Sequence, residues 1–118
     1  MNRHEKGVIG EEAINEYLSR IDCNVVDRNF RTSDGEIDII FFDNDVLVFG
    51  EVKSRMKTNF GLPCEAVDYR KRKKITYVAK QYICIKNIYN TNVRFDVFEV
   101  YIEDKKIRHI KNAYSETI

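Results

Sequence analysis

The chain has 118 residues, of which 43% are apolar and 33% are charged, and its formal net charge is +1. These values are typical of a single globular domain spanning residues 1–118, and they exclude a disordered chain, two linked domains and a membrane-spanning protein. The balanced charge neither favours nor excludes nucleic acid, because a basic face can offset an acidic pocket.

The first predicted element is an amphipathic helix, because apolar residues recur at helical spacing over residues 5–21. Three short runs rich in β-branched and aromatic residues follow, at residues 23–30, 37–42 and 46–52. Tight turns separate these runs. The pattern therefore predicts three antiparallel strands joined by short connections.

A loop, a second helix and two further strands complete the chain. The loop covers residues 59–63, and apolar residues then recur at helical spacing over residues 67–85. Residues 93–102 predict a long strand, and a turn leads to a shorter strand that ends near Ile110. A strand, a helix and another strand imply a crossover connection. We therefore expect an α/β fold in the order α-β-β-β-α-β-β, with a mixed central sheet flanked by two helices.

The N-terminus is charged and lacks the apolar stretch of a secretory signal, so we expect a cytoplasmic protein. The three cysteines, Cys23, Cys64 and Cys84, have no Cys-x-x-Cys spacing, which favours reduced thiols. The histidines are His4 and His109 alone, which disfavours a zinc site of the usual His/Cys type. Any metal ion must therefore be held by oxygen ligands.

Two carboxylates are predicted to meet on neighbouring strands. If residues 44–45 form a hairpin turn, the register places Asp38 opposite Glu51, with Lys53 one step further on the same face. A slip of one residue would separate the two carboxylates, so the expectation depends on this pairing. Opposed carboxylates are unfavourable unless a cation binds between them, and Mg²⁺ or Mn²⁺ suits oxygen ligands. With Lys53 near the attacking water, the set indicates phosphodiester hydrolysis by Asp38, Glu51 and Lys53.

These residues also carry a resemblance to a known superfamily. Gly35-Glu36-Ile37-Asp38 followed by Glu51-Val52-Lys53 resembles the Asp...Glu-x-Lys signature of restriction-endonuclease-like, or PD-(D/E)xK, nucleases, which include archaeal Holliday-junction resolvases. The further motifs Gly10-Glu11, Arg28-Asn29-Phe30-Arg31, Phe49-Gly50, Ser54-Arg55 and Asn112-Ala113 make nearly the whole chain similar to the YraN-like family of uncharacterised proteins. The resemblance implies the restriction-endonuclease-like fold and, by analogy, a nuclease. It also leads us to expect a β-branched residue where this chain has Gly50.

The first helix is expected to supply a third carboxylate. Gly10 lies in the middle of its apolar stripe, where the missing side chain would let the helix approach the sheet, and Glu11 lies at the edge. Glu12 points almost to the opposite side. The resemblance to the resolvases, which carry a metal-binding glutamate on this helix, assigns that role to Glu11. The alternative is a solvated glutamate favoured by the helix dipole.

Basic residues near the predicted site are candidate contacts for nucleic-acid phosphates. Lys71 falls inside the apolar stripe of the second helix, so its ammonium should extend toward a sheet end and reach a DNA phosphate or the carboxylates. The other candidates are Arg28, Arg31, Arg55, Arg72 and Lys73. A basic run such as residues 70–74 is more often a solvated surface, and that alternative stays open.

Three interpretations fit this sequence. The first is a Mg²⁺-dependent endonuclease acting on DNA in preference to RNA, on branched or damaged structures as in the resolvases, with a homodimer left open because two-fold symmetry can pair two sites. The second is a nucleic-acid-binding or protein-binding module that keeps the fold without cleaving. The third is a structural ion-pair network of Asp38, Glu51 and Lys53. Metal-dependent cleavage of DNA separates the first interpretation from the others.

Overall fold

The computed structural model of this chain describes residues 1–57 and 68–118. Helix α1 (Arg3–Arg20) begins after Asn2, whose side-chain oxygen accepts the main-chain N–H of Glu5 at 2.8 Å. This bond satisfies one of the free N–H groups of the first turn. Helix α2 (Tyr69–Ile85) begins in the same way, because the Asp68 carboxylate accepts the N–H of Arg70 at 2.8 Å.

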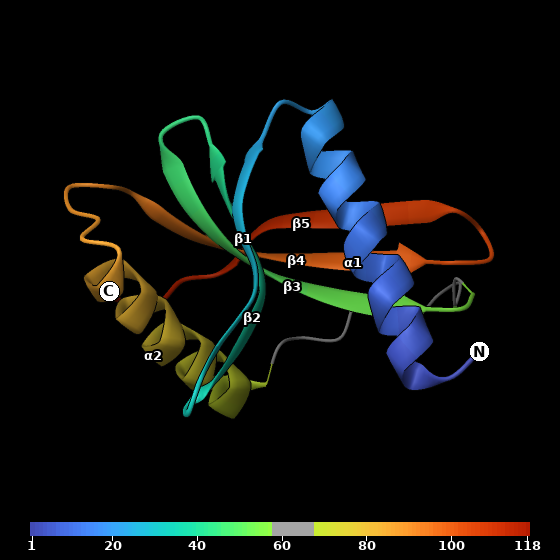
Figure 1. Cartoon of the computed structure of the whole chain (residues 1–118), viewed down its shortest axis with the longest axis horizontal. Coiled ribbons are helices and arrows are strands. Elements are labelled where there is room, and N and C mark those ends of the chain that lie inside the picture. Colours follow the sequence, from blue (N-terminus) through green and yellow to red (C-terminus); the bar gives the residue numbers. More distant parts are fainter. Residues whose placement is uncertain (58–67) are drawn as a thin grey trace.

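Five strands form one sheet in the order β1-β2-β3-β4-β5 (Figure 1). Their bounds are β1 (Asn24–Thr32), β2 (Gly35–Asp43), β3 (Val46–Arg55), β4 (Val93–Tyr101) and β5 (Lys106–Tyr114). Among these described strands the central β3–β4 pair is parallel, and the other neighbours pair antiparallel. The predicted α/β class, mixed sheet and order α-β-β-β-α-β-β are therefore confirmed.

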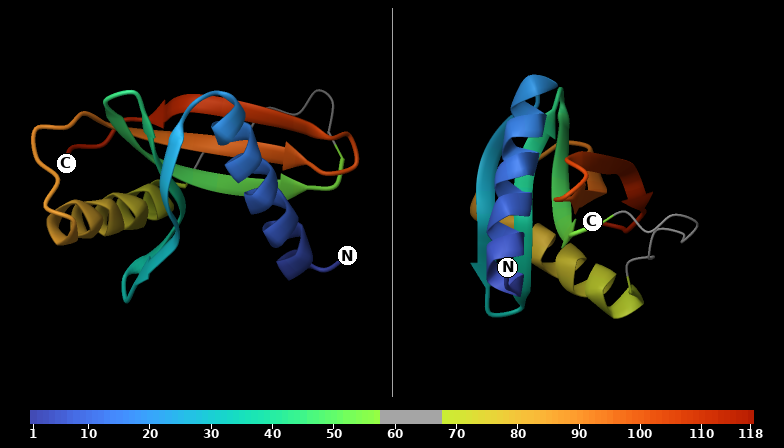
Figure 2. Two further views of the ribbon diagram at one scale, coloured as in Figure 1. Left: turned by 45° about the horizontal axis from the view of Figure 1, so that its top comes forward. Right: turned by 90° about the vertical axis from the view of Figure 1, so that its right-hand side faces the viewer.

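The two helices cover opposite faces of the sheet (Figure 2). Ile14 and Leu18 of α1 pack against one core cluster, which contains alternate residues of β2 and β3 such as Ile39 and Val48. The intervening strand residues pack against Ile75, Val78, Ala79 and Tyr82 of α2 in a second cluster. Because successive strand residues point to opposite faces, the apolar runs of β2 and β3 serve both layers.

Two glycines allow close packing on the α1 side of the sheet. A Cβ at Gly10 would collide with the hydroxyl of Ser54 and lie 3.1 Å from the Ser54 Cβ, so the side chain of Ser54 packs directly against the backbone of α1 here. This confirms the close approach expected at Gly10. A Cβ at Gly50 would lie 2.8 Å from Ile39 Cγ2 and 2.9 Å from Phe98 Cε2. These two side chains already fill the space that a β-branched residue would need.

Several strands extend beyond their predicted ends. β3 continues to Arg55 because it stays paired with β4 as far as Tyr101, and β5 continues to Tyr114, which pairs with Phe95. β1 continues to Thr32 with an irregularity in its pairing near its start. The predicted loop at residues 59–63, the start of the second helix at Val67, and Cys64 lie outside the described residues. Cys23 and Cys84 are free thiols, as expected.

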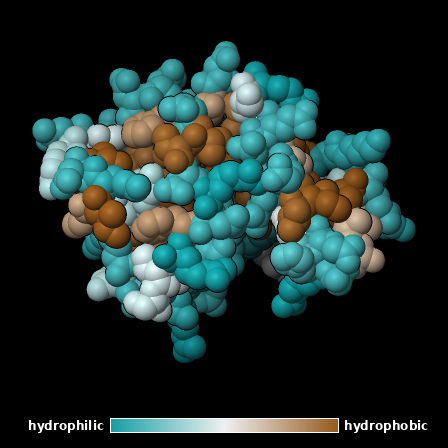
Figure 3. Space-filling model, viewed as in Figure 1, coloured by the Kyte–Doolittle hydropathy of each residue, from teal (hydrophilic) through white to brown (hydrophobic). Residues whose placement is uncertain are grey.

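The surface is largely polar on the face that Figure 3 shows, with apolar side chains in separate groups. Exposed apolar residues include Val8 and Ile9 on α1 and Val26 on β1. None of the described helices has the length and apolar character needed to cross a membrane. The homodimer left open by the sequence stays a prediction.

Candidate active site

The predicted register of the β2–β3 hairpin is confirmed from the turn to the pair Ile39↔Gly50. Beyond that pair the regular pairing of the two strands ends, and the next step would place Asp38 opposite Glu51. There Oδ2 of Asp38 accepts the main-chain N–H of Val52 at 2.8 Å. The carboxylate therefore takes over a hydrogen bond at the point where the strands separate, which fixes its position.

A cavity of ≈ 200 Å³ lies at this separation. Its lining includes both carboxylates, Asp38 from β2 and Glu51 from β3, together with Lys71 and Ile75 from α2. The structure thus brings together the two carboxylates that the sequence predicted to meet. It adds a lysine from the helix that crosses over between β3 and β4.

Glu51 is nearly buried, with 8% of its side chain exposed. Its Oε1 forms an ion pair with the ammonium of Lys71. Its Oε2 is buried and has no hydrogen-bond partner among the described residues. A buried carboxylate oxygen without a donor is costly, and such atoms in native proteins often mark a place for a ligand or an ion. The unpartnered Oε2 of Glu51 is an oxygen ligand that a divalent cation in this cavity could use, so such a cation fits the cavity.

The surroundings of Asp38 shift its carboxyl group toward the neutral form. Burial raises its pKa from 3.8 to about 6, and the negative charges of Glu11, Glu51 and Glu36 act in the same direction, partly offset by the N–H of Val52. The contribution of Glu11 indicates that α1 brings this carboxylate toward Asp38. Glu12, in contrast, forms an ion pair with Arg28 at 2.7 Å.

The ligand role of Glu11 stays a prediction. Among the described residues, no group of three or more His, Cys, Asp or Glu side chains is arranged to hold a metal ion. Asp38 and Glu51 alone are still a suitable pair, because Mg²⁺ usually binds through one or two carboxylates and keeps several waters. The donor set in this cavity therefore fits Mg²⁺ or Mn²⁺ through two protein ligands.

Lys71 forms the ion pair with Glu51, and Lys53 does not. Lys53 follows Glu51 on the same face of β3 and pairs along the parallel ladder with Glu99. Its ammonium makes no ion pair or hydrogen bond within the described part of the chain. Lys71 contacts Glu51 instead, with 55% of its side chain exposed. Of the two destinations predicted for Lys71, the structure shows the active-site carboxylate.

The other predicted phosphate contacts have partners within the protein. The contacts are Arg28 with Glu12 at 2.7 Å, Arg31 with Glu36 at 2.8 Å, Arg55 with Glu99 at 3.5 Å, Lys73 with Glu116 at 3.1 Å, and the Arg72 guanidinium 5.5 Å from the Tyr114 ring centroid. The pairs of Arg28, Arg31 and Lys73 are exposed and weak enough to rearrange around a polyanion, whereas Arg55 pairs with the buried Glu99. Arg72 and Lys73 nevertheless lie against the C-terminal segment rather than at the carboxylates.

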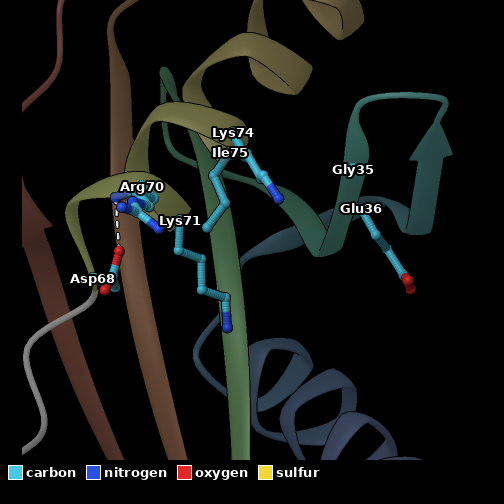
Figure 4. A pocket seen from close by; sticks show the side chains of 7 residues that line it. All are labelled: Gly35, Glu36, Asp68, Arg70, Lys71, Lys74 and Ile75. Atoms are coloured by element: carbon cyan, nitrogen blue, oxygen red, sulfur yellow. Dashed lines mark hydrogen bonds between the residues drawn. The ribbon is translucent and has the colours of Figure 1, made fainter.

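The sequence placed two basic residues in the run at residues 70–74 but did not assign them to the site. Arg70 and Lys74 line a second cavity, of ≈ 420 Å³, together with Lys71 (Figure 4). Lys74 lies four residues after Arg70 and three after Lys71, so it is a neighbour of both on the helix surface. The spacing of Lys74 from Arg70 and Lys71 is the signal in the sequence that could have grouped them.

A mixed five-stranded sheet covered by one helix on each face, with an aspartate and a Glu-x-Lys segment where two central strands separate, defines the restriction-endonuclease-like class of proteins. Residues 10–100 match the model of Uncharacterised protein family UPF0102, and the chain belongs to this family. The matched range contains Asp38, Glu51 and Lys53. The resemblance to the YraN-like family seen in the sequence is thereby confirmed.

Similar proteins cover essentially the same length. A UPF0102 protein of Clostridioides difficile (strain 630) is 48% identical over 114 residues, which span 97% of this chain and 100% of that protein. One of Alkaliphilus metalliredigens (strain QYMF) is 42% identical over 109 residues, spanning 92% and 96%. One of Caldanaerobacter subterraneus subsp. tengcongensis is 40% identical over 119 residues, spanning 97% and 98%. These names give the family and state no activity.

Proposed function

We propose that this protein is a metal-dependent endonuclease that hydrolyses phosphodiester bonds of nucleic acid, with DNA preferred to RNA. The observation that carries the proposal is the convergence of Asp38 and Glu51 on one cavity, with Oε2 of Glu51 buried and without a donor. A purely structural ion pair between Glu51 and a lysine would leave no reason for a second carboxylate in the same cavity.

Asp38 and Glu51 would hold Mg²⁺ or Mn²⁺, and Glu11 is the further carboxylate that α1 brings toward them. When bound, the ion would polarise a phosphoryl oxygen and make a coordinated water more acidic. The protein positions these ligands by the Val52 N–H bond to Asp38 and by the burial of Glu51. Both carboxylates are therefore preorganised, which limits the reorganisation needed when substrate binds.

Two lysines would act on the substrate. Lys53 follows Glu51 on the same face, without a counter-charge among the described residues, so it can hold the attacking water or stabilise negative charge on the phosphoryl oxygens. Lys71 has a flexible and half-exposed side chain, so it can leave Glu51 and donate to a phosphate oxygen. In the reaction, water attacks phosphorus and one P–O ester bond breaks, leaving a phosphate end and a hydroxyl end.

Branched or damaged DNA is the substrate class that we propose, on the basis of the resemblance to Holliday-junction resolvases. A homodimer would place two such sites on the two strands of a junction. The preference for one DNA structure over another would depend on the shape of the DNA, because the proposed catalytic residues contact only the sugar-phosphate backbone at the scissile bond.

The test is incubation of the purified protein with linear, nicked, flapped and four-way DNA, and with matched RNA, in Mg²⁺ or Mn²⁺. We expect a metal-dependent product from DNA that is lost in Asp38→Asn, which keeps an acceptor for the Val52 N–H. Lys53→Met should bind metal almost normally and lose about two orders of magnitude in rate, as is typical for one positioned catalytic group. Lys80→Met, an exposed change on α2, serves as the control.

The absence of product from every substrate with either ion would contradict the proposal, as would a product that persists in Asp38→Asn. DNA binding with a steep salt dependence but without cleavage would support the non-catalytic binding module instead.

A further inference from the structure

The ≈ 420 Å³ cavity adjoins the carboxylate pocket. It lies between the first turns of α2 and the β1–β2 turn at Gly35 (Figure 4). Glu36, Lys71 and Ile75 line both spaces, so one wall is common to the two. A ligand that extends beyond the carboxylate pocket on the side of Lys71 would therefore lie beside this second cavity.

The charges around this cavity are unevenly matched. Its described lining contains three cations, Arg70, Lys71 and Lys74, and two carboxylates. Both carboxylates are already engaged, since Glu36 pairs with Arg31, and Asp68 caps α2 through its bond to the Arg70 N–H. The cap also means that the free N–H groups of the helix are not what makes this site suitable for an anion.

Arg70 and Lys74 are the cations of this lining that have no counter-charge among the described residues. Lys71 is paired with Glu51, whereas the guanidinium of Arg70 and the ammonium of Lys74 make no ion pair or hydrogen bond with any described residue. Arg72 and Lys73 of the same helix do have contacts, with Tyr114 and Glu116. Two cations without a partner among the described residues thus line a cavity that shares a wall with the proposed scissile site.

We propose that this cavity binds a second backbone phosphate of the nucleic acid, next to the phosphate held at Asp38 and Glu51. The inference rests on the proposed function and specifies its substrate further. Arg and Lys are the side chains best suited to phosphate oxygens, and Lys71 stands between the two positions. The substrate is then a strand with at least two consecutive phosphodiesters across the site, and a single phosphodiester fills only the carboxylate pocket.

The first test is equilibrium binding of a short labelled single-stranded DNA to the full chain without metal, over a range of salt concentrations. The double variant Arg70→Gln with Lys74→Gln should bind about tenfold or more weakly at low salt, and its salt slope should fall by about 1.4, since each single-strand phosphate contact contributes about 0.7. The control variant Lys80→Gln with Lys86→Gln removes the same charge from the C-terminal half of α2 and its C-cap, and it should change affinity by less than about twofold. Circular dichroism verifies that each variant is folded.

An equal loss in the Lys80 and Lys86 control would overturn the inference, because the effect would then be one of general charge. A larger loss in Arg72→Gln with Lys73→Gln than in Arg70→Gln with Lys74→Gln would also overturn it, in favour of the contacts predicted from the sequence.

The second test uses cleavable DNA with one neutral methylphosphonate linkage placed beside the scissile bond. Wild-type kcat/KM should fall at that one linkage position, and the Arg70 and Lys74 variant should be insensitive to the same replacement. An equal loss in both proteins would overturn the inference. If the wild type cleaves no substrate, the proposed function fails, and the binding comparison still decides whether this cavity takes a phosphate.

Discussion

At the scale of single residues, Asp38 shows how folding changes the ionisation of a carboxyl group. Burial and the neighbouring carboxylates raise its pKa to about 6, whereas an aspartate in an unfolded chain titrates near 3.9. Between these values the native state holds a proton that the unfolded state has released. The stability contributed by this proton is therefore full below about pH 4 and is lost as the pH rises through about 6. A bound divalent cation would favour the ionised form instead.

Asp38→Asn should remove this pH dependence. Without metal, the variant should match the wild type near pH 4 and be more stable near pH 8, by at most about 3 kcal/mol, since each pKa unit corresponds to 1.36 kcal/mol and the side chain keeps some solvent contact. Urea unfolding at the two pH values measures the difference. Asp45→Asn, in the exposed β2–β3 turn, is the control. A pH dependence equal to that of the wild type would contradict this account of Asp38.

At the scale of elements, the contact between α1 and β3 depends on a missing side chain. Gly10 lies against Ser54 and Val52, whereas Gly7, one turn earlier in the same helix, has nothing within 4 Å of an added Cβ. A substitution at Gly10 therefore tests the packing of the helix against the sheet, whereas the same substitution at Gly7 tests the intrinsic stability of the helix.

Gly10→Ala should destabilise the protein by about 1 to 3 kcal/mol, because the new methyl group overfills the contact with Ser54. Gly7→Ala should stabilise it by about 0.5 to 1 kcal/mol, because alanine favours the helix. Chemical unfolding of both variants measures the two effects. Ser54→Ala should reduce the cost of Gly10→Ala by removing the hydroxyl in its way. Equal effects at the two glycines would contradict the packing seen here.

Helix α2 places a protein cation where a metal ion would bind. Lys71→Met frees Glu51 from its ion pair, so Mn²⁺ or Mg²⁺ should bind more tightly, by about tenfold if the pair is worth about 1.4 kcal/mol. Cleavage should nevertheless fall, because the same lysine is needed on the phosphate. Calorimetry and rate measurements at saturating metal separate these opposite changes, with Lys80→Met as the control. Weaker metal binding by the variant would show that Lys71 supports the ion rather than competing with it.

The parts of the site that could be predicted from sequence are those fixed by local periodicity. The hairpin turn at residues 44–45 determined the alternation of β2 and β3, and so the meeting of Asp38 with Glu51. The helical positions of Gly10 and Glu12 similarly predicted which of them faces the sheet. The partner of Glu51 could not be chosen between Lys53 and Lys71, because that depends on how α2 lies across the sheet. The extra length of β5 depends likewise on pairing with a strand distant in the chain.

At the scale of the whole molecule, the site joins the two layers that cover the sheet. Its residues come from β2 and β3, with α1 bringing Glu11 from one side and α2 bringing Lys71 from the other. Figure 1 shows β1 and β2 curving away from the rest of the sheet toward α2. A ligand between Asp38 and Glu51 would therefore connect this hairpin to the central strands and stabilise the folded unit as a whole.

Thermal melts of the wild type and Glu51→Gln, with and without millimolar Mg²⁺, give four melting temperatures. Together they test whether a metal ion between Asp38 and Glu51 stabilises the fold. Glu51→Gln should raise the metal-free melting temperature by a few degrees, because repulsion with Asp38 is relieved and Lys71 remains solvated. Mg²⁺ should stabilise the wild type, by about 2.7 kcal/mol at a hundred times Kd, and should barely affect the variant. A clear drop for the metal-free variant would instead identify the pair with Lys71 as structural.

The packing around Gly50 has a consequence for how this family can change over time. Ile39 and Phe98 occupy the space that a β-carbon at position 50 would need. The side chains at positions 39, 50 and 98 therefore share one limited packing volume. A descendant that gains a β-branched residue there must first lose bulk at position 39 or 98, and the reverse order passes through a poorly packed protein. Substitutions at these positions should therefore be correlated among relatives. Gly50, which directly precedes Glu51, is thus constrained by its packing against Ile39 and Phe98.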